Sequence, residues 1–441
     1  MDNPRYIVFK ALYKVENEKS YSNLTLDSFL KNSDLSSKDS AFVSALFYGV
    51  LEKKISLDYI ISKFSSVRLK KIESKTLIIL RMGVYQLVFM DKIPDSAAVN
   101  EAVKLCKKER LFHSGGFVNG VLRSITRSEE RFPLPDKSDI IKHLSVKYSC
   151  PEPIVKLWCS DYSEGICERI LKTLSDRPPI FLRVNTLKTN SNELKKLLLE
   201  EQIESESVLV LDNVLKIKYS GALSEKECYK LGLFHIQDLS SQICCEVLDV
   251  KDGDIVSDVC SAPGGKALNL AQRNSNGRVY CYDIYEHKLK LIKSSAERLG
   301  INNIDVTKRD ASSDIPLEMS DRILCDVPCS GLGIIRRKPE IAYKTDNGTD
   351  TLPEIQYRIL EKSAKYLKSG GVLVYSTCTL HRAENGDVVE RFLSEHNEYI
   401  PLPITLPDGV KHIVEEPENQ LTLFPDSDGS DGFFIAAIGK R

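Results

Sequence analysis

The sequence predicts a chain in which an all-α N-terminal part and a small α+β segment precede a doubly wound α/β domain. Three observations indicate this order. Apolar residues recur at helical spacing through residues 1–127, two prolines interrupt a charged stretch within residues 128–139, and short apolar strands alternate with helical stretches over residues 236–441. Residues 140–235 mix both patterns, and we expect the domain boundaries at these positions.

The N-terminal part is expected to contain only helices. Apolar residues lie three or four positions apart in two runs, from Ile7 to Val15 and from Phe42 to Val50. The stretch 76–90 is apolar but too short to cross a bilayer, so we expect a buried helix there. Pro94 then breaks the chain, and a further helix is expected over 97–107.

The later elements follow from two periodicities. In the middle segment, helical patterns surround Trp158 and Ile170, and three stretches resemble strands: 181–185, 207–211 and 214–219. In the last domain the expected strands are 255–259, 278–282, 304–306, 322–325, 372–375 and 432–438. Helices are expected between them, for example over 286–299 and 353–367, which is typical of a mostly parallel sheet.

The bulk composition is that of a globular protein with two or three domains. The 441 residues are 42% hydrophobic and 28% charged, and no apolar run approaches the roughly 20 residues that a membrane span requires. The N-terminus has no apolar signal core, so we expect a cytoplasmic protein with no membrane partner. The twelve cysteines are then expected to be reduced thiols, and because none forms a Cys-x2-Cys pair we expect no metal.

The helical part, residues 1–127, is basic. It carries 21 Lys and Arg against 13 Asp and Glu, whereas the rest of the chain carries 40 against 49. This asymmetry favours a polyanionic partner, although a solvated surface would show the same composition. The candidate phosphate contacts are a cluster near the end of this part and an arginine pair in the last domain: Lys104, Lys107, Lys108, Arg110, Arg336 and Arg337.

A glycine-rich turn follows the first strand of the last domain and opens a helix. It contains Cys260, Ser261, Ala262, Pro263, Gly264, Gly265 and Lys266. Adjacent glycines allow a ligand to approach the backbone, and a helix N-terminus presents free N–H groups. The turn matches neither the Gly-x-Gly-x-x-Gly pattern of NAD sites nor the P-loop.

Two acids strengthen the interpretation as a cofactor site. Asp283 ends the second strand, 19 residues after Gly264, which suits the two hydroxyls of a ribose. Asp310 follows the third strand and could bind an adenine amino group. Both could instead be turn or cap residues, since aspartate is common there. S-adenosylmethionine is the remaining cofactor whose ribose and adenine would be held in this way.

Two cysteines follow later strands in short polar motifs. Cys329 lies in the motif Asp-Val-Pro-Cys-Ser that begins at Asp326, and Cys378 lies in the motif Thr-Cys-Thr. A thiolate that adds to C6 of cytosine converts C5 into a carbon that accepts a methyl group. Asp326 would contact ring N3 if it is protonated, or the base through its amino group, and it is also expected among the cofactor-binding residues. The alternative is that both thiols are small buried hydrophobic groups, as most free cysteines are.

These motifs resemble those of the RNA 5-methylcytosine methyltransferase family. The resemblance implies a Rossmann-like class I methyltransferase fold with a mostly parallel seven-stranded sheet. It further implies that Cys378 is the nucleophile and that Cys329 assists product release. Residues 1–127 resemble a NusB-like RNA-binding domain through the segments 80–87, 97–103 and 117–123. The combination implies a monomeric enzyme acting on 16S rRNA, in a loop or junction with an accessible cytosine, expected to be cytosine 967.

Two other functions remain open at this point. The chain could methylate a tRNA cytosine, because the same chemistry serves both substrates. It could also be an RNA-binding or antitermination factor with a silent catalytic fold, although the presence of both Cys329 and Cys378 argues against this.

Overall fold

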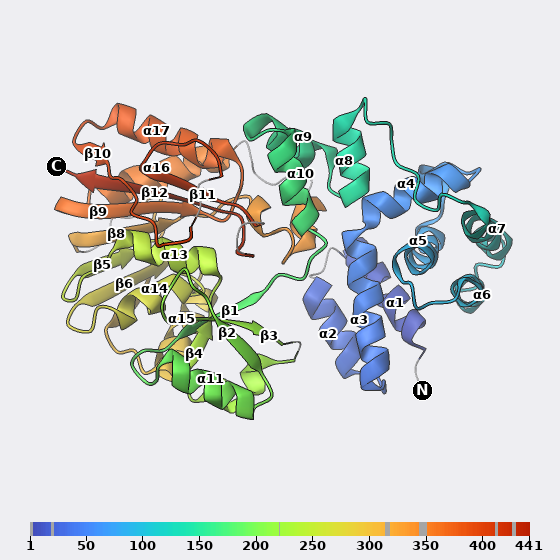
Figure 1. The fold of residues 1–441 in the computed structure, drawn as a ribbon, viewed down its shortest axis with the longest axis horizontal. Helices are drawn as coiled ribbons and strands as arrows, with labels where there is room; N and C mark the ends of the chain where they lie inside the picture. The colour runs from blue at the N-terminus through green and yellow to red at the C-terminus, as the bar shows by residue number, and fades with distance from the viewer. Residues whose placement is uncertain are drawn as a thin grey trace. The chain divides into compact units, whose positions relative to one another are not determined.

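The computed structural model describes residues 3–18, 22–219, 221–313, 318–343, 351–410, 413–425 and 429–441. The chain forms two compact units, whose elements are labelled in Figure 1. The helical unit contains Met1–Ser175 and the later segment Lys338–Lys344, and the sheet unit contains Asp176–Arg337 and Thr345–Arg441. The expected middle segment, 140–235, is therefore divided between the two units.

The helical unit confirms the all-α prediction for residues 1–127. Its elements are α1 (Pro4–Glu18), α2 (Ser22–Lys31), α3 (Ser37–Glu52), α4 (Lys54–Phe64), η1 (Leu69–Lys71), α5 (Ser74–Phe89), α6 (Asp95–Lys108), α7 (Ser114–Arg127), α8 (Ile140–Tyr148), α9 (Glu152–Asp161), α10 (Glu164–Thr173) and η4 (Pro339–Tyr343). Helix α5 is buried along most of its length, as its apolar sequence predicts. Its buried Arg81 is neutralised by Asp58 and Glu16, with N–O distances of 2.6 Å to each.

Segment Lys338–Lys344 packs within the helical unit although it lies far along the chain. Ile341 and Ala342 are buried there. The Tyr343 hydroxyl donates to the Ser149 carbonyl at 3.4 Å, and the Lys54 ammonium lies 5.6 Å from the centre of the Tyr343 ring. The local sequence did not indicate this arrangement, because the apolar residues that bury this segment come from the first third of the chain.

The sheet unit begins with a small antiparallel sheet in the order β2-β3-β1-β4. Its elements are β1 (Ile180–Val184), α11 (Ser191–Glu200), β2 (Glu204–Ser207), β3 (Val214–Lys218), η2 (Leu223–Glu225), α12 (Glu227–Lys230) and β4 (Phe234–Ile236). The strand predicted over 207–211 is wrong, because β2 ends at Ser207 and the apolar run that follows forms the turn before β3. Val208 N–H donates to the Val214 carbonyl across this turn at 3.2 Å, and Leu209 is almost fully exposed.

The large sheet confirms the doubly wound prediction, with strand order β10-β12-β9-β8-β5-β6-β7 and β11 paired to β12. Eight strands are present where seven were expected. The elements are α13 (Leu239–Leu248), β5 (Ile255–Asp258), α14 (Gly265–Gln272), β6 (Arg278–Asp283), α15 (Glu286–Leu299), β7 (Ile304–Lys308), β8 (Ser320–Asp326), η3 (Leu332–Ile334), α16 (Leu352–Ala364), β9 (Leu367–Thr377), η5 (Arg382–Glu384), α17 (Gly386–Glu395), β10 (Tyr399–Pro401), β11 (Gln420–Leu423) and β12 (Phe433–Lys440).

The sheet topology determines where a ligand would bind. Strands β7, β6, β5, β8 and β9 are parallel, and β10, β11 and β12 complete the sheet through antiparallel pairs. Helices α13, α14 and α15 bury their apolar residues in one core, and α16 and α17 bury theirs in another. The direction of winding reverses between β5 and β8, and open α/β sheets bind ligands outside the carboxyl ends of strands at such a point. The predicted turn and both thiol motifs follow these strands.

Candidate active site

The glycine-rich turn after β5 is held by its own backbone hydrogen bonds. Ser261 N–H donates to the Tyr282 carbonyl at 2.8 Å, and Gly264 N–H donates to the Ser261 carbonyl at 2.7 Å. Gly264 has φ +108°, and a Cβ there would lie 3.1 Å from Ile292, so only glycine is compatible with this bend. Helix α14 starts at the next residue, Gly265, with no side-chain cap. No capping side chain accepts a hydrogen bond from the first N–H groups of α14. Free N–H groups of this kind are what an anion or other ligand binds at a helix N-terminus.

The acids at successive strand ends fit a nucleoside-bearing cofactor. Asp258 is buried and its Oδ1 has no hydrogen-bond partner, so the site contains an unused acceptor. Burial, reinforced by repulsion from Asp326, raises the pKa of Asp258 to about 7. Asp283 Oδ1 accepts from Tyr285 N–H at 2.9 Å, and Asp310 Oδ1 accepts from Ser312 N–H at 2.9 Å. Asp283 and Asp310 thus both make the turn contacts that were the alternative to a role in cofactor binding. The same contacts fix the orientation of their carboxylates.

The two predicted thiols lie together. Asp326 of β8 pairs in register with Ser376 of β9, so the loops after these parallel strands leave the sheet side by side. The Cys329 and Cys378 sulfurs are 3.2 Å apart, and the hydroxyls of Ser330 and Thr379 are 2.8 Å apart. The hydrogen bond with Cys378, together with burial, raises the pKa of the Cys329 thiol well above its ordinary value.

An ion pair joins the cofactor turn to the first thiol motif. Lys266 Nζ donates to Asp326 Oδ2 at 2.6 Å, and the Ser376 hydroxyl donates to Asp326 Oδ1 at 2.9 Å. Burial opposes the charge on Lys266, but the attraction of Asp326 outweighs it and raises the pKa of Lys266. Both carboxylate oxygens of Asp326 are thus occupied, which the spacing of the motifs did not indicate.

A buried glutamate lies behind the Cys329 loop and was not predicted from the sequence. The Glu384 side chain is fully buried, and its Oε2 accepts from Ser330 N–H at 2.8 Å and from Gln356 Nε2 at 2.9 Å. Gln356 Nε2 also donates to the Pro328 carbonyl at 3.0 Å. Burial alone would raise the pKa of Glu384, but hydrogen bonds from His381, Ser330 and Gln356 lower it.

The neighbour of Glu384 supports the other thiol loop. Asn385 Nδ2 donates to the Thr379 carbonyl at 3.0 Å, and Asn385 Oδ1 accepts from the Thr377 hydroxyl at 2.6 Å. The adjacent Glu384 and Asn385 thus hold both loops. The adjacent polar residues Glu384 and Asn385, soon after Cys378, were the signal that the sequence offered.

The predicted RNA contacts differ in their surroundings. Lys104 is an exposed partner of Glu101 at 2.7 Å, and Lys108 Nζ lies 3.6 Å from the centre of the Tyr6 ring. Lys104 and Lys107 also line a groove of about 540 Å³ beside Phe112, whose side chain is 70% exposed. Arg110 follows α6 with a left-handed backbone, at φ 59°.

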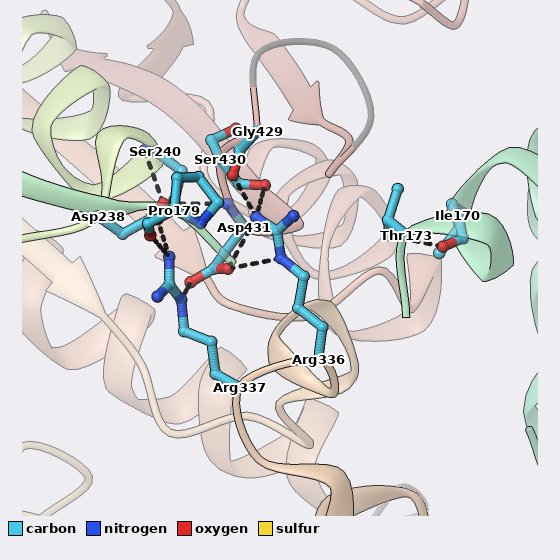
Figure 2. Close-up of polar contacts among 10 residues, drawn as sticks. All are labelled: Ile170, Thr173, Pro179, Asp238, Ser240, Arg336, Arg337, Gly429, Ser430 and Asp431. Atoms are coloured by element: carbon cyan, nitrogen blue, oxygen red, sulfur yellow. Dashed lines mark hydrogen bonds and ion pairs between the residues drawn. The ribbon is translucent and has the colours of Figure 1, made fainter. Parts of the chain in front are cut away.

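The arginine pair after η3 has a different environment from the one predicted. Arg336 is only 8% exposed and donates to the backbone carbonyls of Gly429 and Ser430, and Arg337 donates to Asp238 and Asp431 (Figure 2). The phosphate contacts of Arg336 and Arg337 stay a prediction, although both guanidinium groups already bind oxygen atoms of this chain. The carboxylates that bind them come from distant parts of the sequence, so local charge alone suggested an exposed basic patch.

Two kinds of feature are absent from the described residues. Among these residues no helix is both long and apolar enough to span a bilayer. Nor does the described part of the chain bring together three or more His, Cys, Asp or Glu side chains in a group able to hold a metal ion.

Three family models match the chain in succession. The NusB family matches residues 2–127, an RsmF/B-like ferredoxin-like domain matches 150–223, and the 16S rRNA methyltransferase RsmB/F model matches 245–439. Among solved structures, that of PH0851 superposes with a TM-score of 0.81 at 24% identity, covering 100% of this chain and 99% of the other, which shows the shared fold. A methyltransferase homologue from Pyrococcus horikoshii superposes with a TM-score of 0.59 at 28% identity, covering 69% of this chain and 99% of the other.

Curated relatives match over the full length. The probable ribosomal RNA small subunit methyltransferase B of Bacillus subtilis (strain 168) is 38% identical, covering 99% of this chain and 98% of the relative. The protein of the same name from Synechocystis sp. is 32% identical over 100% of both chains. The chain therefore belongs to the family of 16S rRNA methyltransferases RsmB/F, whose methyl donor is S-adenosylmethionine.

Proposed function

We propose that this chain methylates C5 of a cytosine in 16S rRNA, expected to be cytosine 967, through a transient covalent bond between Cys378 and C6 of the base. The observation that carries the proposal is the 3.2 Å approach of the Cys378 and Cys329 sulfurs at the carboxyl edge of the sheet. The Lys266–Asp326 pair and the turn at Gly264 end at the same edge, so nucleophile and cofactor groups share one site. The proposal includes a loop or junction as the target and a monomeric, cytoplasmic enzyme.

The covalent route follows from the reactivity of cytosine. The Cys378 thiolate adds to C6, and the electron pair of the C5–C6 double bond becomes available at C5. The bound cofactor supplies the electrophilic methyl group at that carbon. Loss of the C5 proton to a base and cleavage of the C6–S bond then restore the ring and return the Cys378 thiolate. We assign assistance in this release step to Cys329, because its sulfur lies 3.2 Å from that of Cys378.

The remaining residues bind and orient the reactants. The turn from Cys260 to Lys266 holds the cofactor beside Asp258, while Asp283 and Asp310 receive its ribose and adenine. We assign the contact with the amino group of the cytosine to Asp326, whose carboxylate is held by Lys266 and Ser376.

Access to C6 requires the target base to leave its stack, which is easiest where bases are unpaired. We assign phosphate contacts in the helical unit to its basic cluster: Lys104, Lys107, Lys108 and Arg110.

Transfer of a labelled methyl group from S-adenosylmethionine to unmodified small-subunit rRNA tests the proposal, followed by mapping of the modified base. We expect one 5-methylcytosine with the wild-type chain and none with Cys378→Ala. Cys228→Ala is the matched control, because this thiol lies in α12 and is buried in the core beside the small antiparallel sheet, outside the site. Incorporation into tRNA but not rRNA would replace the substrate assignment, and RNA binding without any incorporation would reject the enzymatic proposal.

A further inference from the structure

Two aspartates and two arginines, Asp238, Asp431, Arg336 and Arg337, form a largely buried network (Figure 2). Arg337 bridges the two acids, with Nε 2.5 Å from Asp431 Oδ2 and Nη2 2.7 Å from Asp238 Oδ2. Arg336 Nη2 lies 3.3 Å from Asp431 Oδ1, and Asp431 N–H donates to Asp238 Oδ1 at 3.1 Å. Three charged side chains from two other segments of the chain, Asp238, Arg336 and Arg337, therefore fix the position of Asp431.

The burial of this network indicates that its geometry matters. Asp431 is only 4% exposed. Burial and repulsion from Asp238 raise the pKa of Asp431 to about 6, and the two arginines offset part of this effect. Removing one partner from a buried ionic group leaves an uncompensated charge, which is costly.

The residue after Asp431 lies directly against the backbone that carries the thiol. Gly432 N–H donates to the Gly333 carbonyl at 3.0 Å, and Gly333 N–H donates to the Cys378 carbonyl at 3.0 Å. A Cβ on Gly333 would lie 2.0 Å from the Gly432 carbonyl oxygen and 2.8 Å from that of Cys378. The three backbone segments are thus in direct contact, and a shift of Gly432 must move the Cys378 peptide.

We propose that Asp431, held by Arg336 and Arg337, is a positioning residue that fixes the peptide of Cys378 through Gly432 and Gly333. The inference rests on the proposed function, because it takes Cys378 as the nucleophile. Arg337 is then a structural link from the Cys329 motif to the start of the last strand, where Asp431 precedes β12. The network sets the approach of the sulfur to C6 without touching substrate or cofactor.

The test compares Asp431→Asn with Asp305→Asn. The control acid pairs with Arg278 on the same sheet, at 2.5 Å, but is half exposed and lies away from the thiol loops. We expect kcat to fall ~10- to 100-fold for Asp431→Asn, as for a displaced reactive group, with KM for RNA and the cofactor Kd within about twofold of wild type. Asp305→Asn should retain wild-type kinetics.

Adduct formation separates positioning from general loss of structure. In a Cys329→Ala background, the rate at which RNA becomes covalently attached to Cys378 should fall together with kcat when Asp431 is changed. Thermal melts identify any variant that fails to fold, in which case Arg337→Lys serves instead, because it keeps the charge but cannot bridge both acids. In Arg337→Lys we expect the same loss of kcat without a change in KM.

Two results would overturn the inference. One is a folded Asp431→Asn enzyme with wild-type kcat and wild-type adduct formation. The other is a raised KM for RNA at unchanged kcat, which would assign the network to RNA binding. Failure of the proposed function is distinguishable, because it would appear as methyl transfer by Cys378→Ala, whatever the behaviour of the Asp431 variants.

Discussion

At the scale of single residues, the thiol pair gives the most direct prediction. Cys329→Ala should leave the attack by Cys378 intact and slow release, because the thiol 3.2 Å from the nucleophile is lost while the nucleophile remains. A protein–RNA adduct should then survive denaturing gel electrophoresis. The double variant Cys329→Ala with Cys378→Ala is the control and should give no adduct. A stable adduct in the double variant would show that a different group attacks the base.

Asp283 gives a second prediction at this scale. Replacement by Ala removes a carboxylate proposed to accept from the cofactor ribose, and a hydrogen bond to a charged group is worth about 1.5–3 kcal/mol. We expect the affinity for S-adenosylmethionine to fall about 10- to 100-fold, measured by calorimetry in the absence of RNA. Unchanged affinity would remove Asp283 from the cofactor site.

Asp258 makes stability depend on pH in a defined direction. Its pKa is raised to about 7 in the folded chain, whereas an unfolded Asp titrates near 3.9. Between these values the folded state binds more protons than the unfolded state, so stability falls as pH rises from about 4 to about 7. Asp258→Asn should flatten this part of the profile in urea titrations at successive pH values. An equally steep decline in the variant would assign the effect to other groups.

At the scale of elements, the large sheet was predictable and the small strands were not. Strands such as β5 and β8 are buried on both faces and separated by amphipathic helices, so their local sequence carries the signal. Strands β4 and β10 have three residues each and depend on partners elsewhere in the chain. The same reasoning explains which parts of the candidate site could be predicted. Cys378 and Gly264 lie in recognisable motifs, but the contacts of Arg336 with Asp431 join residues 95 positions apart.

The short helix η3 provides a test at this scale. Gly333→Ala would place a methyl group against two carbonyl oxygens, and we expect a destabilisation of about 1–3 kcal/mol together with loss of methyl transfer. Gly120→Ala is the matched control, since a Cβ there meets nothing within 4 Å in the exposed face of α7. That change should stabilise the chain by about 0.5–1 kcal/mol. Denaturant titrations of both variants check the two expectations.

At the scale of the whole molecule, the helical unit is built from two separate stretches of chain. Residues 176–441 produced alone would carry Ile341 and Ala342 without the apolar surface that buries them. We expect this fragment to aggregate more than the full chain, and replacement of Ile341 by Ser to reduce the effect. Light scattering at matched concentrations is the measurement. A fragment that stays monodisperse with Ile341 in place would show that exposure of this segment does not cause aggregation.

The same split sets an order for folding during synthesis. Helices α1 to α10 leave the ribosome first, yet the last piece of their unit, Lys338–Lys344, emerges only after most of the parallel strands have been made. Domains generally fold as units from the N-terminus during translation. In this protein the helical unit therefore receives its last segment only after β8 has been translated, while β9 to β12 of the sheet unit are still to be made.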